Sequence, residues 1–236
     1  MTIGGELDQT MRAVCAGQDR RCDLVHSEAR ALLQSDLDPD SYYQATVRSK
    51  KRKELRRQSK RLSELGDLAF NHRRDGAGLD QWAEDFLNLE RSGWKGQNGS
   101  ALDSAEQTGT FFKQILAGAA KARQLERHDV FLDGQPLAML VNFLSSPGSF
   151  SFKTAFDEQY ARYSPGVLLQ LENLKILQKP AIQWMDSCAA EDHPMIDSLW
   201  SGRRHIGRFS VELAGFSRKT RSEEHTSELQ SRSDLV

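Results

Sequence analysis

Lys153-Thr-Ala-Phe-Asp-Glu-Gln-Tyr-Ala-Arg-Tyr-Ser-Pro-Gly166, followed at once by Val167-Leu-Leu-Gln-Leu-Glu-Asn-Leu174, is the stretch that decides the fold. It predicts an apolar strand over 149–156, a polar loop, and a helix that starts at Ser164 and Pro165, residues typical of the N-cap and the first helical position. Gly166 would let a ligand approach the backbone closely. Such a helix start can hold a phosphate, and an ordinary strand-to-helix turn is the alternative.

Helical and strand patterns continue on both sides of this stretch. Helices are predicted at 40–47, 48–65, 79–91, 103–121 and 167–177, with 4–17 and 26–34 weakly helical. Strands are predicted at 68–72, 124–132, 136–144, 149–156, 181–187 and 205–213, the second and third as a hairpin around Asp133-Gly134. In the helix 103–121, Phe111, Phe112, Ile115 and Leu116 are expected to face inward. The order of elements predicts an α/β domain with a mixed sheet and flanking helices.

Four segments in order carry a family resemblance. Besides residues 153–166, they are Lys50-Lys-Arg-Lys-Glu-Leu-Arg-Arg-Gln58, residues 86–96 around Ser92-Gly-Trp-Lys-Gly96, and residues 186–197 with His193-Pro-Met-Ile-Asp197. Together they resemble the GNAT acyltransferase superfamily, in its branch of BioF-like and CelD-like acetyltransferase domains related to the FemAB aminoacyl transferases. The resemblance implies the GNAT acyl-CoA N-acyltransferase fold, whose core order of three strands, a helix and a strand agrees with the pattern.

The resemblance also implies an acyl-CoA donor. In that superfamily the donor's pantetheine arm lies between two diverging strands, here 149–156 and 181–187, and its phosphates lie at the following helix start. The donor-binding residues carried over are Phe156, Arg162, Ser164, Gly166 and Val167. Arg162-Tyr-Ser-Pro-Gly166 stands where most of the superfamily has an Arg/Gln-x-x-Gly-x-Gly/Ala loop, which leaves the donor open, because FemAB relatives use aminoacyl-tRNA.

Catalytic groups are expected where the strand 149–156 ends. Asp157 or Glu158 could act as general base for the incoming acceptor, and Tyr163 or Tyr160 could protonate the leaving thiolate. The alternative is that both carboxylates are solvated loop charges or partners of the helix dipole. Lys153 lies on the same strand face as Asp157 and could contact phosphate or substrate, or lie on the surface.

Trp94 and Lys95 lie in a glycine-rich loop and are candidate contacts for a small-molecule or saccharide acceptor. The alternative for Trp94 is a core anchor after the helix. The resemblance places the acceptor loosely in cell-envelope or exopolysaccharide metabolism.

Metal and nucleophile sites are not predicted. His72, His128, His193 and His205 lie on separate predicted elements without ligand spacing. Asp186, Cys188 and His193 match no nucleophile motif. Cys15, Cys22 and Cys188 are too few and too scattered for a disulfide framework or a zinc site, which favours a reducing, cytoplasmic setting.

A basic helix supports a second class of function. Nine Lys and Arg residues between Arg48 and Arg61 could bind the phosphates of a nucleic acid or an anionic lipid. The alternative is a solvated helix face. The formal net charge of −1 and the lack of interleaved aromatics argue against nucleic acid as a partner, and no apolar run is long enough for a membrane span. A non-catalytic half of a two-domain transferase is a third hypothesis.

The two ends of the chain are expected to differ from the rest. Residues 1–38 are interpreted as the remnant of a preceding, truncated GNAT-like half, and 39–220 as the acyltransferase domain. Residues 221–236 resemble a translated sequencing adapter; their Ser- and Glu-rich composition predicts a disordered tail without packed contacts.

Overall fold

The computed structural model describes residues 1–93, 96, 98–99 and 101–213, which form two compact units. The described part of the first unit is 1–30, 190–192 and 203–213, and the second is 31–189 with 193–202. The α-helices are α1 (Glu6–Gly17), α2 (Pro39–Thr46), α3 (Ser49–Ser63), α4 (Leu79–Ser92), α6 (Glu106–Lys121), α7 (Pro165–Asn173) and α8 (Pro194–Asp197). The strands are β1 (Cys22–Leu33), β2 (Leu68–Arg73), β3 (Leu125–Leu132), β4 (Gln135–Ser145), β5 (Gly148–Phe156), β6 (Trp184–Asp186) and β7 (Gly202–Val211). Two 3-10 helices, η1 (Glu158–Tyr163) and η2 (Leu174–Gln178), flank α7.

The strands form one mixed sheet in the order β2-β3-β4-β5-β6-β1-β7. The neighbours from β2 to β5 pair antiparallel, whereas β5 and β6 pair parallel. A parallel pair needs a crossover connection, and η1, α7 and η2 supply it. The predicted α/β class with a mixed sheet and flanking helices is therefore confirmed.

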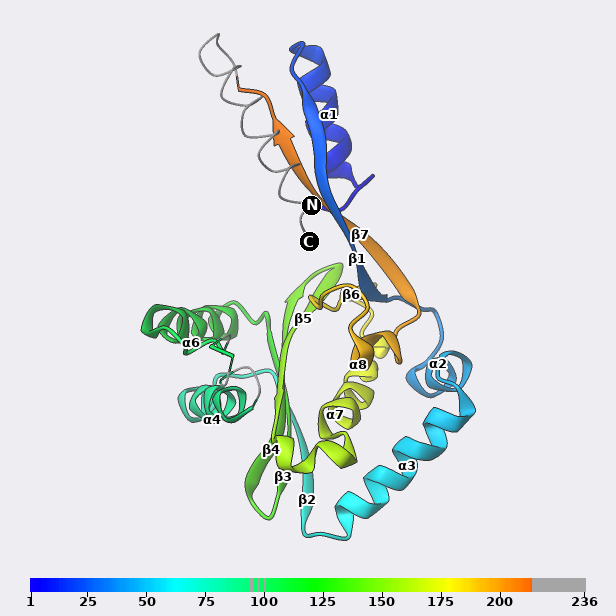
Figure 1. Ribbon diagram of the computed structural model, residues 1–236, viewed down its shortest axis with the longest axis vertical. Coiled ribbons are helices and arrows are strands. Elements are labelled where there is room, and N and C mark those ends of the chain that lie inside the picture. Colours follow the sequence, from blue (N-terminus) through cyan, green and yellow to red (C-terminus); the bar gives the residue numbers. More distant parts are fainter. Residues whose placement is uncertain (94–95, 97, 100, 214–236) are drawn as a thin grey trace. The chain divides into compact units, whose positions relative to one another are not determined.

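Within the second unit, each face of the sheet is covered by its own helices (Figure 1). On one face, α4 and α6 bury Trp82, Phe86 and Phe112 against apolar residues of β3 to β5. On the other face, α7 and α3 bury Leu62, Leu168 and Leu169 against β3 and β4. Burial of these apolar side chains is the main force that holds the layers together.

A further core cluster of the second unit lies where α2, α8 and η2 meet. Its largest side chain is Trp200, which is 1% exposed and packs with Tyr42, Leu55 and Ile176. The hydroxyl of Tyr42 accepts a hydrogen bond from the Ser201 backbone N–H at 3.1 Å. This cluster anchors the segment that follows α7.

The first unit contains α1, most of β1 and most of β7. The Glu212 backbone carbonyl accepts from Arg20 Nε at 2.7 Å, and its carboxylate accepts from the Arg21 N–H at 3.0 Å. Cys15 and Cys22 both lie in this unit. Burial raises the pKa of the Cys22 thiol, and the neighbouring Cys15 is the second cause of that shift. All three cysteines are free thiols.

Several predicted elements differ from the structure. Of residues 26–34, predicted as weakly helical, all but Gln34 lie in strand β1, which has β6 and β7 as its neighbours in the sheet. The helix predicted at 103–121 begins only at Glu106, after an N-cap at Ala105, and the helix predicted at 40–47 begins at Pro39, after an N-cap at Asp38. Phe111 points outward with 59% of its surface exposed, whereas Phe112 is buried as predicted. None of the described helices is both long and apolar enough to cross a lipid bilayer.

Candidate functional site

The strands β5 and β6 pair over only three residue pairs and then part. Gly148, Ser149 and Phe150 pair with Trp184, Met185 and Asp186, and among the described residues the rest of β5 pairs with β4 alone. On that second edge Lys153 pairs with Val141 and Ser151 with Asn142, which leaves Phe152 as an extra residue. Such a bulge bends a strand and is common beside active sites.

A chain of buried amides ties α7 to β4 and β5 beside this point. The Asn142 side chain donates to Asn173 at 2.7 Å, and Asn173 donates to Gln170 at 3.0 Å. Gln170 Nε2 in turn donates to the hydroxyls of Ser151 and Thr154, each at 3.2 Å. A buried network of this kind fixes a single position of the helix against the strand, because a shift would leave buried polar groups without partners.

The loop between β5 and α7 is shaped by its own backbone. Asp157 is the N-cap of η1, and its carboxylate accepts from the Gln159 N–H at 2.9 Å. Ser164 and Pro165 occupy the N-cap and first helical position of α7, as predicted, but Ser164 has left-handed angles (φ 53°, ψ 49°) and its side chain makes no capping hydrogen bond. A residue other than glycine in that region costs of order 1 kcal/mol, so the surrounding structure must hold it there.

Gly166 packs closely against neighbouring side chains, and its backbone angle is not unusual. A Cβ atom at this position would lie 3.3 Å from Phe156 Cδ1 and 3.4 Å from Met195 Sδ. On this side of the helix, the side chains of Phe156 and Met195 fill the space next to Gly166. The backbone N–H groups of Gly166 and Val167 lie in the first turn of α7, where the helix itself supplies no acceptor.

A small recess lies on the opposite face of β5, beside the end of α4. It has about 240 Å³ of empty space, open to solvent, and is lined by Leu89, Glu90, Gly93, Thr154, Ala155, Phe156 and Glu158. The Lys153 ammonium binds the buried Glu90 carboxylate at 2.9 Å. Glu158 lies against Gly93, where an added Cβ would be 2.8 Å from its Oε1. Glu158 therefore lines this recess, whereas Lys153 reaches it only through its ion pair with the lining residue Glu90.

The remaining predicted site residues have mixed surroundings. Tyr163 is only 8% exposed and packs in the apolar cluster under α7. The exposed Arg162 guanidinium lies 4.7 Å from the centroid of the Tyr163 ring. Trp94 and Lys95 lie outside the described residues, as does the predicted tail 221–236.

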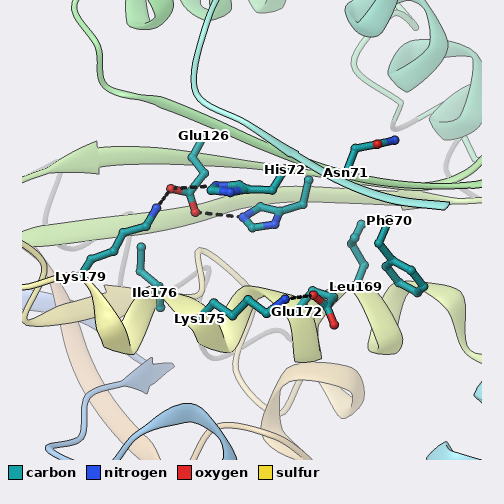
Figure 2. A pocket seen from close by; sticks show the side chains of 10 residues that line it. Phe70, Asn71, His72, Glu126, Leu169, Glu172, Lys175, Ile176 and Lys179 are labelled. Atoms are coloured by element: carbon teal, nitrogen blue, oxygen red, sulfur yellow. Dashed lines mark hydrogen bonds and ion pairs between the residues drawn. The ribbon is translucent and has the colours of Figure 1, made fainter.

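A second pocket, missed by the sequence analysis, lies at the other end of α7 (Figure 2). It has about 510 Å³ of empty space, open to solvent, and is lined by Phe70, Asn71, His72, Glu126, His128, Leu169, Glu172, Lys175, Ile176 and Lys179. The Nε2 atoms of His128 and His72 lie 2.9 Å and 3.5 Å from the two oxygens of the Glu126 carboxylate. The Lys179 ammonium also contacts this carboxylate, and the exposed Arg74 lies 3.9 Å from it.

The electrostatics of this pocket follow from burial. Burial lowers the pKa of His128 to about 3. Burial also lowers the pKa of His72, and the positive charge of Lys179 is the second cause of that shift. Burial, followed by the charge of Arg74, lowers the pKa of Lys179 to about 8. Both imidazoles are therefore neutral at neutral pH, and Nε2–H of His128 donates to Glu126.

Strand register explains why these residues meet. Glu126 and His128 are two apart on β3 and so share one face, and the antiparallel pairing places His72 directly opposite His128. His72 and His128 lie on separate strands, as predicted, but the register of β2 and β3 brings them together with Glu126 into a group with metal-ligand spacing. The visible signal was the alternation Glu126-x-His128 next to a predicted strand that contains His72.

The model of the family "Acetyltransferase (GNAT) domain" matches residues 49–195. No curated protein is similar enough to count as a match. Among solved structures, FemX superposes with a TM-score of 0.58 and 12% identity over 82% of this chain and 62% of the FemX chain. The C-terminal domain of a putative lysylphosphatidylglycerol synthetase from Agrobacterium fabrum has a TM-score of 0.52 and 11% identity over 92% of this chain and 69% of its own. At identities of 11–12%, the structural likeness shows a shared fold and nothing more. This chain spans less than two thirds of the length of FemX.

Proposed function

Because this chain belongs to the acetyltransferase (GNAT) domain family, we propose that it transfers an acyl group from acyl-coenzyme A to an amine or hydroxyl. The acceptor is a small molecule or a saccharide, and a role in cell-envelope or exopolysaccharide metabolism stays a prediction. The observation that carries the proposal is the short parallel pairing of β5 with β6, with α7 starting directly after the loop at the free end of β5. Strands that part in this way leave unpaired backbone groups to bind a ligand.

Acyl-coenzyme A would supply the activated acyl group as a thioester. The first-turn N–H groups of Gly166 and Val167, with the positive end of the α7 dipole, are suited to hold its phosphates. Arg162 adds an exposed positive charge in the same loop. The buried amides of Asn142, Asn173 and Gln170 hold α7 in place against β4 and β5 and so keep these groups fixed relative to the strands.

The acid and base assignments follow from the recess beside β5. Glu158 is the preferred general base, because it lines that recess, whereas the Asp157 carboxylate accepts from the Gln159 N–H in the loop. Glu158 would take the proton that the acceptor loses when the acceptor's nitrogen or oxygen attacks the acyl carbon. The thiolate of coenzyme A then leaves and is protonated. The buried setting of Tyr163 favours a structural role over proton donation.

Replacing Arg162 with glutamate is expected to weaken acetyl-coenzyme A binding on the order of tenfold, because a charge that would face the phosphates is reversed. The measurement is isothermal calorimetry with acetyl-coenzyme A, after a melting curve shows that the variant is folded. The matched control is Arg208→Glu, which reverses an exposed charge on β7. Equal affinity in wild type and both variants would refute the placement at α7.

A turnover assay tests the reaction itself. Release of the coenzyme A thiol from acetyl-coenzyme A is followed with amine and hydroxyl acceptors, in wild type and in Glu158→Gln. The expected result is acceptor-dependent release that falls by about a hundredfold or more in the variant. Binding without acceptor-dependent release would instead support the non-catalytic half of a two-domain transferase.

A further inference from the structure

We propose that His72, Glu126 and His128 form a binding site for one divalent transition-metal ion of the zinc class. Two imidazoles and one carboxylate are the protein ligands of an open zinc site, in which a water or a substrate takes the fourth position. The candidate ligand atoms of the three side chains all lie within 4.8 Å of one another. Tetrahedral zinc with bonds near 2.0–2.1 Å holds its ligands roughly 3.4 Å apart, so the atoms need to move by only about 1 Å.

The two rings must rotate to share an ion. His72 and His128 are stacked, with centroids 4.6 Å apart and planes inclined by 23°, whereas a metal ion lies in the plane of each ring that binds it. Rotation about the second side-chain torsion of histidine is soft, and the His72 side chain is 45% exposed, so it has room to turn. The ion takes the place of the proton that His128 Nε2 shares with Glu126, and that proton is released.

The Lys179 ammonium competes with a metal ion for the Glu126 carboxylate. The Glu126 side chain is 1% exposed, and a buried carboxylate needs a cation or hydrogen-bond donors beside it. The Lys179 ammonium meets that need when the ion is absent. Its flexible stem lies at the pocket wall with 22% of the side chain exposed, so the ammonium can move into water when an ion binds Glu126.

The pocket has room for a fourth ligand of the metal ion. The three ligand side chains line the pocket, which has about 510 Å³ of empty space open to solvent. Leu169 and Ile176 are among the apolar residues that line it. An apolar surround lowers the local dielectric and strengthens the bond between an ion and a small anionic or carbonyl ligand. The site lies along the C-terminal half of α7 and η2, away from the start of α7 that the proposed acyl donor would use, so the two proposals stand or fall separately.

The test is a metal titration of the full chain after chelator treatment and dialysis. Cobalt(II) is added as a spectroscopic probe, and zinc is then added to displace it. The expected result is one ion per chain, with visible absorption of a four-coordinate ion that zinc removes. His72→Ala is expected to weaken binding by at least about tenfold, and because His72 is exposed the variant should fold. His205→Ala, which removes an exposed histidine on β7, should bind like wild type.

Lys179→Met distinguishes a metal site from an anion site. Removal of the competing ammonium should tighten metal binding by several-fold, whereas a pocket built for an anion would lose affinity for inorganic phosphate in the same variant. No stoichiometric binding by wild type, equal loss in His72→Ala and His205→Ala, or weaker metal binding by Lys179→Met would each overturn the proposal.

Discussion

Replacing Phe112 with alanine is expected to lower the free energy of unfolding by about 4 kcal/mol, the usual cost of removing a buried aromatic ring. Phe112 is 1% exposed, and its ring lies 5.1 Å from that of Phe86 between α4, α6 and the sheet. Collapse of the neighbouring helices can fill only part of the cavity. For a chain of this size the melting temperature should fall by roughly 8–16 °C, measured by circular dichroism or calorimetry.

The neighbouring residue provides the matched control. Phe111→Ala removes the same ring from the same helix, but Phe111 is 59% exposed, so the free energy of unfolding should change by less than about 0.5 kcal/mol. Equal losses in the two variants would show that α6 buries a different face from the one described.

Replacing Gln170 with alanine is expected to cost about 2–3 kcal/mol of stability and to weaken acetyl-coenzyme A binding as well. Gln170 is 1% exposed and links Asn173 to Ser151 and Thr154. Its loss leaves a small cavity and buried amide and hydroxyl groups with fewer partners. It also releases α7 from β5, so the proposed phosphate-binding turn is less well placed. Chemical denaturation and calorimetry give the two quantities.

Gln178→Ala is the control for this variant, because Gln178 is exposed at the end of η2. It should leave both stability and donor affinity close to those of wild type. Loss of stability in Gln170→Ala without loss of donor affinity would mean that the amide network supports the core but not the proposed donor site.

The strands and helices that surround α7 were predictable because their signals are local. The hairpin of β3 and β4, the strand β5 and the start of α7 at Pro165 follow from alternation and turn residues. β1 could not be predicted, because Glu28-Ala-Arg-Ala-Leu-Leu33 is rich in helix formers and adopts a strand through pairing with the neighbouring strands β6 and β7. Phe111 was misassigned because adjacent helical residues point about 100° apart, so only one of the pair can face the core fully.

The candidate site was predictable only where its residues are close in sequence. Residues 153–166 could be assigned to one strand and loop, but the recess also needs Glu90 and Gly93 from the end of α4. No sequence rule places those two residues beside β5. The same limit applies to the amides of Asn142 and Gln170, whose contact depends on how α7 packs across the sheet.

The pairing of His72 with His128 depends on the register of β2 and β3 and on which face of the sheet each side chain points to. It does not depend on the number of residues between the two histidines. A one-residue insertion inside β2 would turn His72 to the opposite face of the sheet and dissolve the cluster. An insertion in the surface connection at 74–78 would leave it intact, because strand register alone sets the pairing. Related proteins could therefore keep this cluster at quite different sequence spacings, and a motif of fixed length would not find it.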